Sequence, residues 1–262
     1  MSIQPGRPKR SAVDRTFSVL SAFDQRNQVL TLSDISRRSG LPVATVHRIV
    51  AKLHSRGALE RAATGEYSIG LRLWEIGTLA PRGSVLREAA LPHLMTFRTQ
   101  ATATVILAVR DGTETFCLEM ISDGRGHRPP LAAPGGRAPL HTNAPGLVLL
   151  AHAGPADREE VCSLLLRPTR RRDGVTYPAL RGVLGQVRRQ GYAVTGHQEP
   201  GRTALLAAPV RAAGGMVVAA LGAVRDSGPE DRPELLPLVL ATADAISEQL
   251  AASTRGSLDT AI

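Results

Sequence analysis

Residues 43–55 combine an apolar stripe with side chains that bind phosphates and nucleobases. The apolar residues recur at helical spacing and are Val46, Ile49, Val50 and Leu53. The other faces carry Ala44, Thr45, His47, Arg48 and Lys52. Guanidinium and ammonium groups contact DNA phosphates, and an arginine also forms paired hydrogen bonds with guanine. The pattern predicts a helix that is buried on one side and binds double-stranded DNA on the other.

Other reactive side chains give weaker signals. The two cysteines, Cys117 and Cys162, lack the paired spacing of a zinc site and suit buried thiols. None of the seven histidines stands at tight ligand spacing with another histidine or a cysteine. We find no nucleophile or acid–base pair at a spacing typical of catalytic motifs and no glycine-rich phosphate motif. The sequence therefore predicts no metal site, no cofactor and no enzyme activity.

The charge is concentrated at the start of the chain. The formal net charge is +9 over 262 residues. Residues 1–72 hold 12 Lys and Arg against five Asp and Glu, so they carry +7 of that excess. Such asymmetry is typical of a nucleic-acid-binding module joined to a nearly neutral domain. No apolar run approaches the roughly 20 residues that span a bilayer, and residues 1–10 lack the apolar core of a signal peptide. We therefore expect no membrane partner and a cytoplasmic protein.

Short signals around residues 43–55 predict the elements that position this helix. Apolar spacing of Val13, Phe17, Leu20 and, less strictly, Phe23 predicts a first helix over 11–23. Thr31 and Asp34 resemble a capping box, and Gly40 with Pro42 marks a turn before the next helix. Residues 58–69 read as a hairpin with a basic flank at Arg61. The predicted fold is a winged helix-turn-helix over 11–70, with Thr31 and Arg61 as further DNA contacts. The alternative is a small helical domain with solvated charges.

This module resembles the winged-helix domain of IclR-type transcriptional regulators. The matching stretches are SAVDRTFSVLSAF, LTLSDISRRSGLPVATVHRIVAKLHSRGALER and GEYSIGLRLWEIGTLA. Thr45, His47 and Arg48 match the family, whereas Val43 and Ala44 stand where it commonly has lysine and serine. The resemblance implies a DNA-binding regulator.

A linker helix is expected over residues 71–83. Leu73, Ile76 and Ala80 have helical spacing, and Trp74 is the only tryptophan. This apolar face can pack on its own domain or on a second chain. The family resemblance implies that it joins the domains and pairs the DNA-binding domains, in a homodimer or a dimer of dimers. We expect a basic, disordered tail over 1–10 and a second tail over 256–262.

Residues 84–255 predict an α+β domain with an antiparallel sheet. Asp111-Gly112 between two β-prone runs is a strong hairpin signal. Further strands are expected near 192–196, 203–210 and 216–224. Helices are expected near 84–100, 143–151, 156–166, 177–190 and 230–252. Hairpins flanked by helices indicate a sheet covered by helices.

This half resembles the GAF-like effector-binding domain of the same family. The matching motifs are GGRAPLHTNAPG, LGQVRRQGYAV and LLAAPVRAAGGMVVAALGAV, so the resemblance spans roughly residues 11–252. It implies an effector site, and the matching positions are Asn143, Ala144, Pro145, Thr195, Thr203, Leu205, Gly222 and Val224.

Several of these positions depart from the family pattern. Relatives that bind small carboxylates tend to present an acid, a cysteine and serines at Thr195, Leu205, Gly222 and Val224. Leu147 replaces a common lysine. The departures favour an effector with an apolar or aromatic part, because an ionised group is costly to bury without a partner. Thr195, Thr203 and the loop around Asn143 would orient one polar end. Helix starts and loop N–H groups would be further anchors.

The sequence thus predicts a DNA-binding transcriptional regulator whose operator affinity is modulated by a small-molecule effector. One alternative is an oligomeric DNA-binding regulator without an effector. The other is an enzyme built on the GAF-like domain.

Overall fold

The computed structural model resolves the chain into two compact units, Met1–Pro81 and Arg82–Ile262. The structure describes residues 11–24, 27–101, 103–122, 131, 133–165, 177–196, 204–225 and 232–259. The predicted tail 1–10 and the predicted effector residue Thr203 lie outside the described residues. The finer domain boundaries at 70, 83 and 255 stay predictions.

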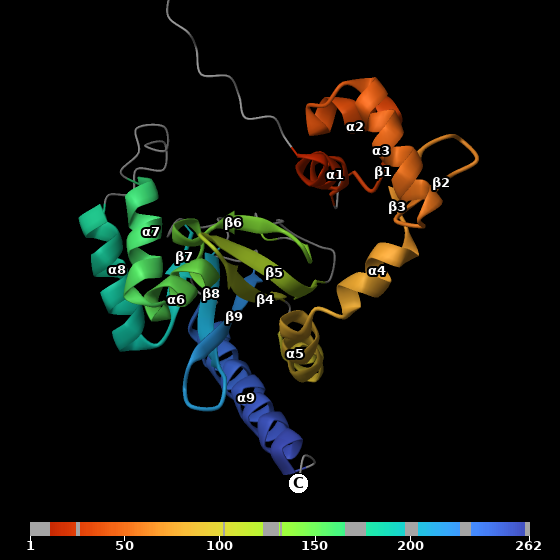
Figure 1. Cartoon of the computed structure of the whole chain (residues 1–262). Coiled ribbons are helices and arrows are strands. Elements are labelled where there is room, and N and C mark those ends of the chain that lie inside the picture. The colour runs from red at the N-terminus through yellow and green to blue at the C-terminus, as the bar shows by residue number, and fades with distance from the viewer. Residues whose placement is uncertain are drawn as a thin grey trace, which may run out of the picture. The chain divides into compact units, whose positions relative to one another are not determined.

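The first unit contains the expected winged helix-turn-helix (Figure 1). Its helices are α1 (Ala12–Leu20), α2 (Leu32–Ser39), α3 (Val43–Ser55) and α4 (Leu71–Thr78). An antiparallel sheet in the order β1-β3-β2 consists of β1 (Val29–Leu30), β3 (Tyr67–Ile69) and β2 (Leu59–Arg61). The β2–β3 hairpin is the predicted wing.

Local chemistry explains where the helices of the turn begin and end. The Thr31 side chain accepts a hydrogen bond from the backbone N–H of Asp34, and the Asp34 carboxylate accepts one from the backbone N–H of Thr31. This is the predicted capping box at the start of α2. Gly40 ends α2 in the left-handed region at φ 67°, which glycine adopts without steric cost.

The first helix is shorter than predicted, and only part of its predicted apolar line packs. We expected residues 11–23, but α1 ends at Leu20. Val13 and Phe17, two members of the predicted apolar line, are 63% and 64% exposed, whereas Val19 is fully buried. Val19 packs with Ile35, Val46 and other residues in the core of this unit. Leu20 and Phe23 are half-buried against the same core, so apolar spacing predicted only part of the packing face.

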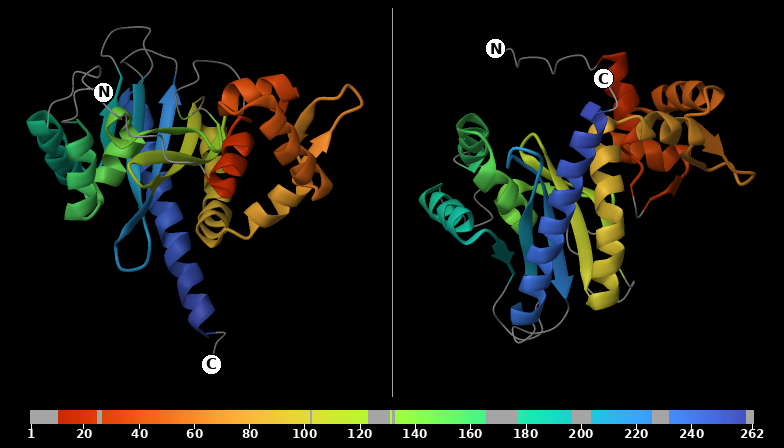
Figure 2. Two further views of the ribbon diagram at one scale, coloured as in Figure 1. Left: turned by 45° about the horizontal axis from the view of Figure 1, so that its top comes forward. Right: turned by 90° about the horizontal axis from the view of Figure 1, so that it is seen from below.

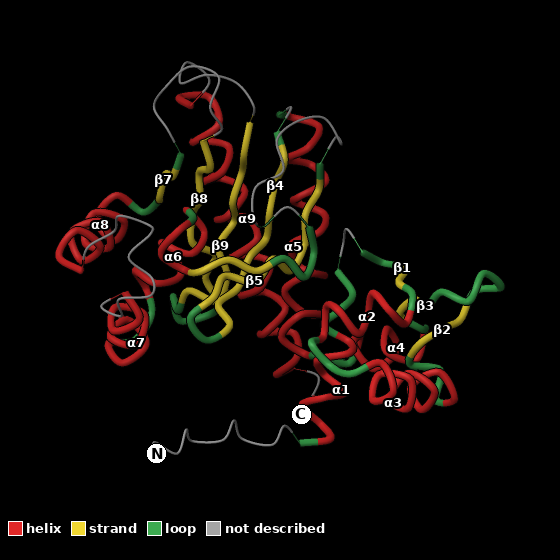
Figure 3. Tube along the Cα trace, turned by 90° about the horizontal axis from the view of Figure 1, so that it is seen from above, coloured by secondary structure: helices red, strands yellow, loops and turns green. Residues whose placement is uncertain are grey.

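The second unit is built on a six-stranded antiparallel sheet in the order β6-β5-β4-β9-β8-β7 (Figure 3). The strands are β4 (Thr104–Asp111), β5 (Glu114–Ile121), β6 (Arg137–Pro139), β7 (Ala193–Thr195), β8 (Ala204–Arg211) and β9 (Val217–Arg225). The predicted Asp111-Gly112 hairpin joins β4 to β5. The short strand β6 was not predicted, because three residues are too few to show an alternating pattern.

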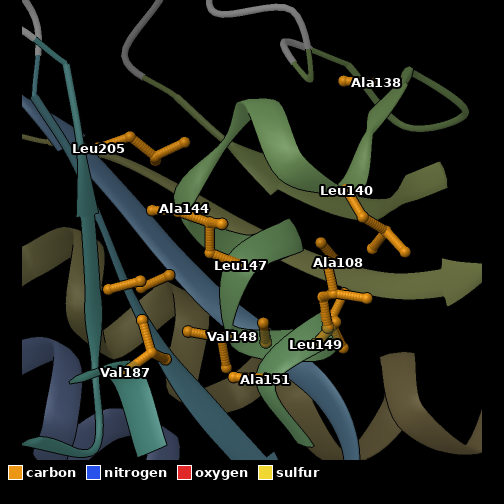
Figure 4. Close-up of a cluster of buried hydrophobic side chains, with 14 of the residues drawn as sticks. Ala108, Ala138, Leu140, Ala144, Leu147, Val148, Leu149, Ala151, Val187 and Leu205 are labelled. Carbon is orange, nitrogen blue, oxygen red and sulfur yellow. The ribbon is translucent and has the colours of Figure 1, made fainter. Parts of the chain in front are cut away.

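Helices cover both faces of this sheet, as the α+β prediction requires (Figure 2). They are α5 (Pro81–Gln100), the 3₁₀ helix η1 (Leu140–Thr142), α6 (Ala144–His152), α7 (Pro155–Leu165), α8 (Tyr177–Gln190) and α9 (Arg232–Asp259). Alternate residues of β4 separate two cores. Val105 and Leu107 pack with residues of α5 and α9, whereas Ile106 and Ala108 pack with residues of α6 and α8. Figure 4 shows part of the core between α6 and the sheet.

Helix α9 contains an unexpectedly long apolar stretch. By length and composition, Leu235–Ser253 would suffice to cross a membrane. Its residues Leu235, Val239, Ala243 and Ile246 are at most 3% exposed and pack in the core shared with α5 and the sheet. The stretch therefore has the contacts of a core helix.

Candidate DNA-binding face and effector site

The residues predicted to bind DNA occupy one side of α3. Val46 and Val50 are buried in the core of the first unit. Ala44, His47, Arg48 and Lys52 are exposed, and Thr45 is half-buried. The structure thus brings the predicted α3 residues together on faces that are open to solvent.

The cations of α2 and α3 differ in their partners. On α2, Arg37 forms an ion pair with Asp34 at 2.6 Å, and Arg38 pairs with Asp24. On α3, neither Arg48 nor Lys52 forms an ion pair with any residue that the structure describes. The positive charge of α3 is therefore the more available of the two for an external anion.

The other two predicted DNA contacts are placed differently. Thr31 caps α2, and its hydroxyl donates to Oδ2 of Asp34 at 2.7 Å. Its single hydroxyl proton is thus already used within the protein. Arg61 is exposed on β2, with its guanidinium 5.6 Å from the centre of the Tyr67 ring. Arg61 is therefore held on the wing, while Thr31 has a clear structural role.

The wing is attached to the end of α3. Nδ1 of His54 lies 3.1 Å from the carbonyl oxygen of Leu59, and the His54 ring meets the Tyr67 ring edge to face. The last turn of α3 thereby contacts both strands of the hairpin. Sequence reasoning did not find this role of His54, because the contact depends on tertiary packing.

In the second unit, the start of α6 is fixed by a buried polar network. Oδ1 of Asn143 accepts a hydrogen bond from the backbone N–H of Gly146 at 2.8 Å. Nδ2 of Asn143 donates to Oγ1 of Thr115 at 3.1 Å and to the carbonyl oxygen of Pro139 at 3.0 Å. Asn143 is 4% exposed, so its amide positions α6 and is already engaged on both sides.

Two residues that the sequence analysis missed complete this network. Thr115 is fully buried on β5 and pairs with Asn143. Gly146 leaves no room for a side chain, because a Cβ there would lie 2.2 Å from the carbonyl oxygen of Leu140 and 2.5 Å from Oγ1 of Thr115. A glycine three residues after a capping asparagine was the available signal for this close approach.

Most of the predicted effector residues converge between α6 and the sheet. Leu205 on β8 is paired with Val224 on β9 and with Thr195 on β7. Leu205 projects toward the first turn of α6, where Ala144 lies (Figure 4). Pro145 reaches Gly222, since a Cβ at Gly222 would be 2.9 Å from Cγ of Pro145. Asn143 belongs to the polar network that fixes the start of α6.

The site is apolar, and α6 begins with its donors occupied. The backbone N–H of Ala144 donates to Oγ1 of Thr195 at 3.0 Å. The N–H of Gly146 is bonded to Asn143, and that of Leu147 donates to the carbonyl oxygen of Asn143. In the free chain, these N–H groups at the start of α6 therefore donate within the protein.

A separate pocket of about 460 Å³ lies at the other end of β4 and β5. It is lined by Asp111, Gly112, Thr113, Glu114, Pro139, His141, Glu160, Val161 and Leu164. None of the predicted effector residues lines it. Asp111 and Glu114 are both paired with Arg137, at 2.6 and 3.3 Å. Both of these acids are therefore partly neutralised by Arg137.

The described residues offer little catalytic or metal-binding chemistry. Burial raises the pKa of the Cys117 thiol to about 12, so this sulfur stays protonated at neutral pH. Burial also raises the pKa of Cys162. Within the described part of the chain, no three His, Cys, Asp or Glu residues are grouped as metal ligands.

Comparison with known families identifies both units. Residues 12–63 match the IclR helix-turn-helix domain, and residues 82–248 match the C-terminal domain of bacterial IclR transcriptional regulators. The chain belongs to the IclR family. It is a DNA-binding transcriptional regulator with a C-terminal effector-binding domain.

Individual relatives agree with this assignment. An IclR homologue from Microbacterium hydrocarbonoxydans, solved with 4-hydroxybenzoate, is 35% identical, with a TM-score of 0.80 over 92% of this chain and 100% of that one. The regulator BhcR of Paracoccus denitrificans is 30% identical over 76% of this chain and 71% of its own length. XynR of Escherichia coli K12 is 28% identical over 82% and 85%.

Proposed function

We propose that this chain binds operator DNA through α3 and the wing, and that an aromatic effector bound between α6 and the sheet changes its operator affinity. The observation that carries the DNA-binding part is the exposed charge of Arg48 and Lys52 opposite the buried Val46 and Val50. Neither cation makes an ion pair with a residue that the structure describes. Thr45, His47 and Ala44 lie beside these cations, where small and polar side chains allow close approach to base edges.

The wing supplies the second DNA contact of this proposal. Arg61 is exposed on β2, and the attachment of the hairpin to α3 through His54 holds both elements in one unit. A guanidinium at this place would contact phosphate and so orient α3. Thr31 supports the same face indirectly by capping α2.

The DNA-binding proposal is tested by salt dependence. The operator is first selected from a random pool of duplexes, and its affinity is measured by fluorescence anisotropy at several salt concentrations. We expect the logarithm of the affinity to fall linearly with that of the salt concentration, with a slope near −0.9 for each phosphate contacted. Lys52→Gln should reduce the slope by about one contact, whereas a slope near zero would contradict phosphate binding by this face.

A homodimer or a dimer of dimers accounts for the apolar surface of the first unit. Helix α4 has no buried residue, and Leu71, Trp74, Ile76 and Leu79 are between 54% and 77% exposed. An isolated helix this short is unstable in water without packing, and a second copy of the chain would cover it. Sedimentation should show a dimer or tetramer, and Ile76→Glu should weaken it. A wild-type monomer at micromolar concentration would contradict this assignment.

An aromatic effector suits the lining of the second site. Leu147, Leu205 and Val224 are each less than 8% exposed in the free chain and present aliphatic surface. The Microbacterium relative bound to 4-hydroxybenzoate is similar to this chain over nearly its whole length. An aromatic ring gains roughly 25 cal/mol for each Å² of apolar surface buried. Thr195 would orient a hydroxyl on the ring, and a carboxylate such as that of 4-hydroxybenzoate would stay in contact with water, because the start of α6 has no unbonded donor for it.

Calorimetry with a panel of ligands tests the effector class. We expect 4-hydroxybenzoate and related aromatic compounds to bind, and glyoxylate and pyruvate to bind weakly. Tight binding of the small acids without binding of aromatics would contradict the proposal. No ligand-dependent shift in thermal unfolding with any compound would instead favour a regulator without an effector.

Binding rather than turnover is proposed for this site, because its described residues contain no acid–base pair. The compound should be recovered unchanged after incubation with the protein, and release of a product would contradict this. Since the proposed partner is genomic DNA, we propose a cytoplasmic location.

A further inference from the structure

The first turn of α6 has no N–H group left for a ligand. Ala144, Gly146 and Leu147 each donate to a protein oxygen, at 3.0, 2.8 and 2.9 Å. Position 145 is proline, which has no N–H. A helix N-terminus normally attracts anions through its unbonded N–H groups and its dipole. In α6 these N–H groups are already bonded within the protein, so they do not offer direct hydrogen bonds to an anion.

The ring of Pro145 also occupies the space above Gly222. A Cβ at Gly222 would approach Cγ of Pro145 to 2.9 Å and Cδ1 of Leu205 to 3.5 Å. The proline ring is rigid and belongs to a helix turn that Asn143 fixes to Thr115 and Pro139. A side chain at 222 and a proline at 145 are therefore incompatible without a shift of α6 or β9.

Thr195 on β7 contributes one hydroxyl group beside this turn. Oγ1 of Thr195 accepts the N–H of Ala144, and this acceptor bond leaves the threonine O–H able to donate elsewhere. The Leu205 and Val224 side chains beside it are apolar. The described surroundings therefore combine an apolar wall with a single side-chain donor.

We propose that Pro145 and Gly222 form a matched specificity pair, which closes the start of α6 to small carboxylates and creates a wall for the ring of an aromatic effector. Pro145 acts twice, by removing an N–H donor and by filling the volume that a polar side chain at 222 would need. Thr195 orients the polar end of the ligand. This inference rests on the proposed effector site and names what determines its ligand class.

Four proteins test the pair: the wild type, Pro145→Ala, Gly222→Ser and the double variant. Thermal unfolding without ligand measures the steric part. Gly222→Ser should lower the Tm strongly in the wild-type background and much less in the Pro145→Ala background. Gly182→Ala is the control, because a Cβ at Gly182 meets nothing within 4 Å and should not lower the Tm. Equal losses from Gly222→Ser in both backgrounds would overturn the interlock.

Calorimetry with glyoxylate, a small carboxylate, and with phenol, a neutral aromatic ring, measures the specificity part. The double variant restores an N–H at position 145 and places a hydroxyl at 222, so it should bind glyoxylate at least about tenfold more tightly than the wild type. It should bind phenol, an aromatic ring without a carboxylate, more weakly, because the ring loses its wall. A folded double variant with wild-type affinities for both compounds would overturn the specificity role.

These outcomes separate this inference from the proposed function. A wild-type protein that binds neither aromatics nor small acids would contradict the effector class. The unfolding cycle would still decide the interlock, and the double variant's gain of glyoxylate binding would still decide whether the pair excludes small acids.

Discussion

The two candidate sites use polar groups in opposite ways. On α3, Arg48 and Lys52 extend into solvent and make no ion pair with the described residues. At the start of α6, the N–H groups are bonded to Thr195 and Asn143 or are absent at Pro145. A surface that must bind a polyanion keeps its cations available, whereas a site for an apolar ring satisfies its polar groups internally. The contrast shows why charge reveals the first site and only tertiary contacts reveal the second.

The largest expected effect separates the core of α3 from its exposed face. Val46 is fully buried, and Val46→Asp would place an unpaired charge in the core. The cost is several kcal/mol, which is comparable to the whole stability of a small domain, about 5–15 kcal/mol. We expect loss of the first unit's helical signal and of all DNA binding. Retained binding of 4-hydroxybenzoate would show that the second unit is unaffected. A folded, DNA-binding Val46→Asp protein would contradict the assigned core.

The next effect tests the polar network under α6. Gly146→Ala forces a methyl group into the carbonyl oxygen of Leu140 and the hydroxyl of Thr115. Overpacking of this kind costs about 1–3 kcal/mol, and these contacts favour the upper end. Denaturant unfolding should show this loss of stability. Calorimetry should show weaker ligand binding, and the operator affinity should be unchanged. Gly182→Ala on α8 is the matched control. An unchanged midpoint for Gly146→Ala would mean that α6 is packed differently.

A smaller effect tests the exposed face of α3. Arg48→Ala should weaken operator binding by about 1–3 kcal/mol if the guanidinium reads a base, and should relax specificity at that base pair. The unfolding midpoint should not change, because Arg48 is exposed. Arg37→Ala is the control, since Arg37 is already paired with Asp34. Equal losses in both variants would contradict the special availability of the α3 cations.

The smallest effect concerns the cap of α2. Thr31→Ala removes the side-chain acceptor for the N–H of Asp34, and loss of such a cap costs about 1 kcal/mol. The measurement is again the unfolding midpoint. If Thr31 only positions α2, operator affinity should fall much less than in Arg48→Ala. A larger fall would restore Thr31 as a direct DNA contact.

The same cap gives a pH dependence with a defined sign. The hydrogen bond from Thr31 lowers the pKa of Asp34 below its ordinary value. A carboxyl whose folded pKa is depressed contributes stability above its unfolded pKa and loses it as the pH falls through the folded one. Acid titration of the wild type should therefore remove a contribution that Thr31→Ala already lacks. Parallel acid titration curves for the two proteins would contradict this origin.

The sequence predicts the first site more completely than the second for a physical reason. Exposure of Arg48 follows from helical spacing around Val46, and the box at Thr31 and Asp34 is local. The pairing of Pro145 with Gly222 joins residues 77 positions apart, and no local pattern encodes it. The exposed Phe17 shows the same limit, because spacing identifies a stripe but not what covers it. The family resemblance supplied the effector positions. The structure shows that Asn143 differs from the others, because its amide is hydrogen-bonded within the protein.

The most direct test is the operator affinity of the wild type and of Leu205→Glu, each with and without saturating 4-hydroxybenzoate. Allosteric coupling typically changes affinity by about 5–150-fold. We predict such a shift for the wild type and no shift for Leu205→Glu, whose charge would face the apolar wall. Because Leu205 is buried and an unpaired charge there costs stability, the comparison uses Leu205→Glu protein whose second unit still unfolds cooperatively on heating. Both proteins should have the same operator affinity without ligand. A ligand shift that persists in Leu205→Glu would contradict the assigned effector site. No shift in a wild type that binds the ligand would contradict the account that this site controls DNA binding.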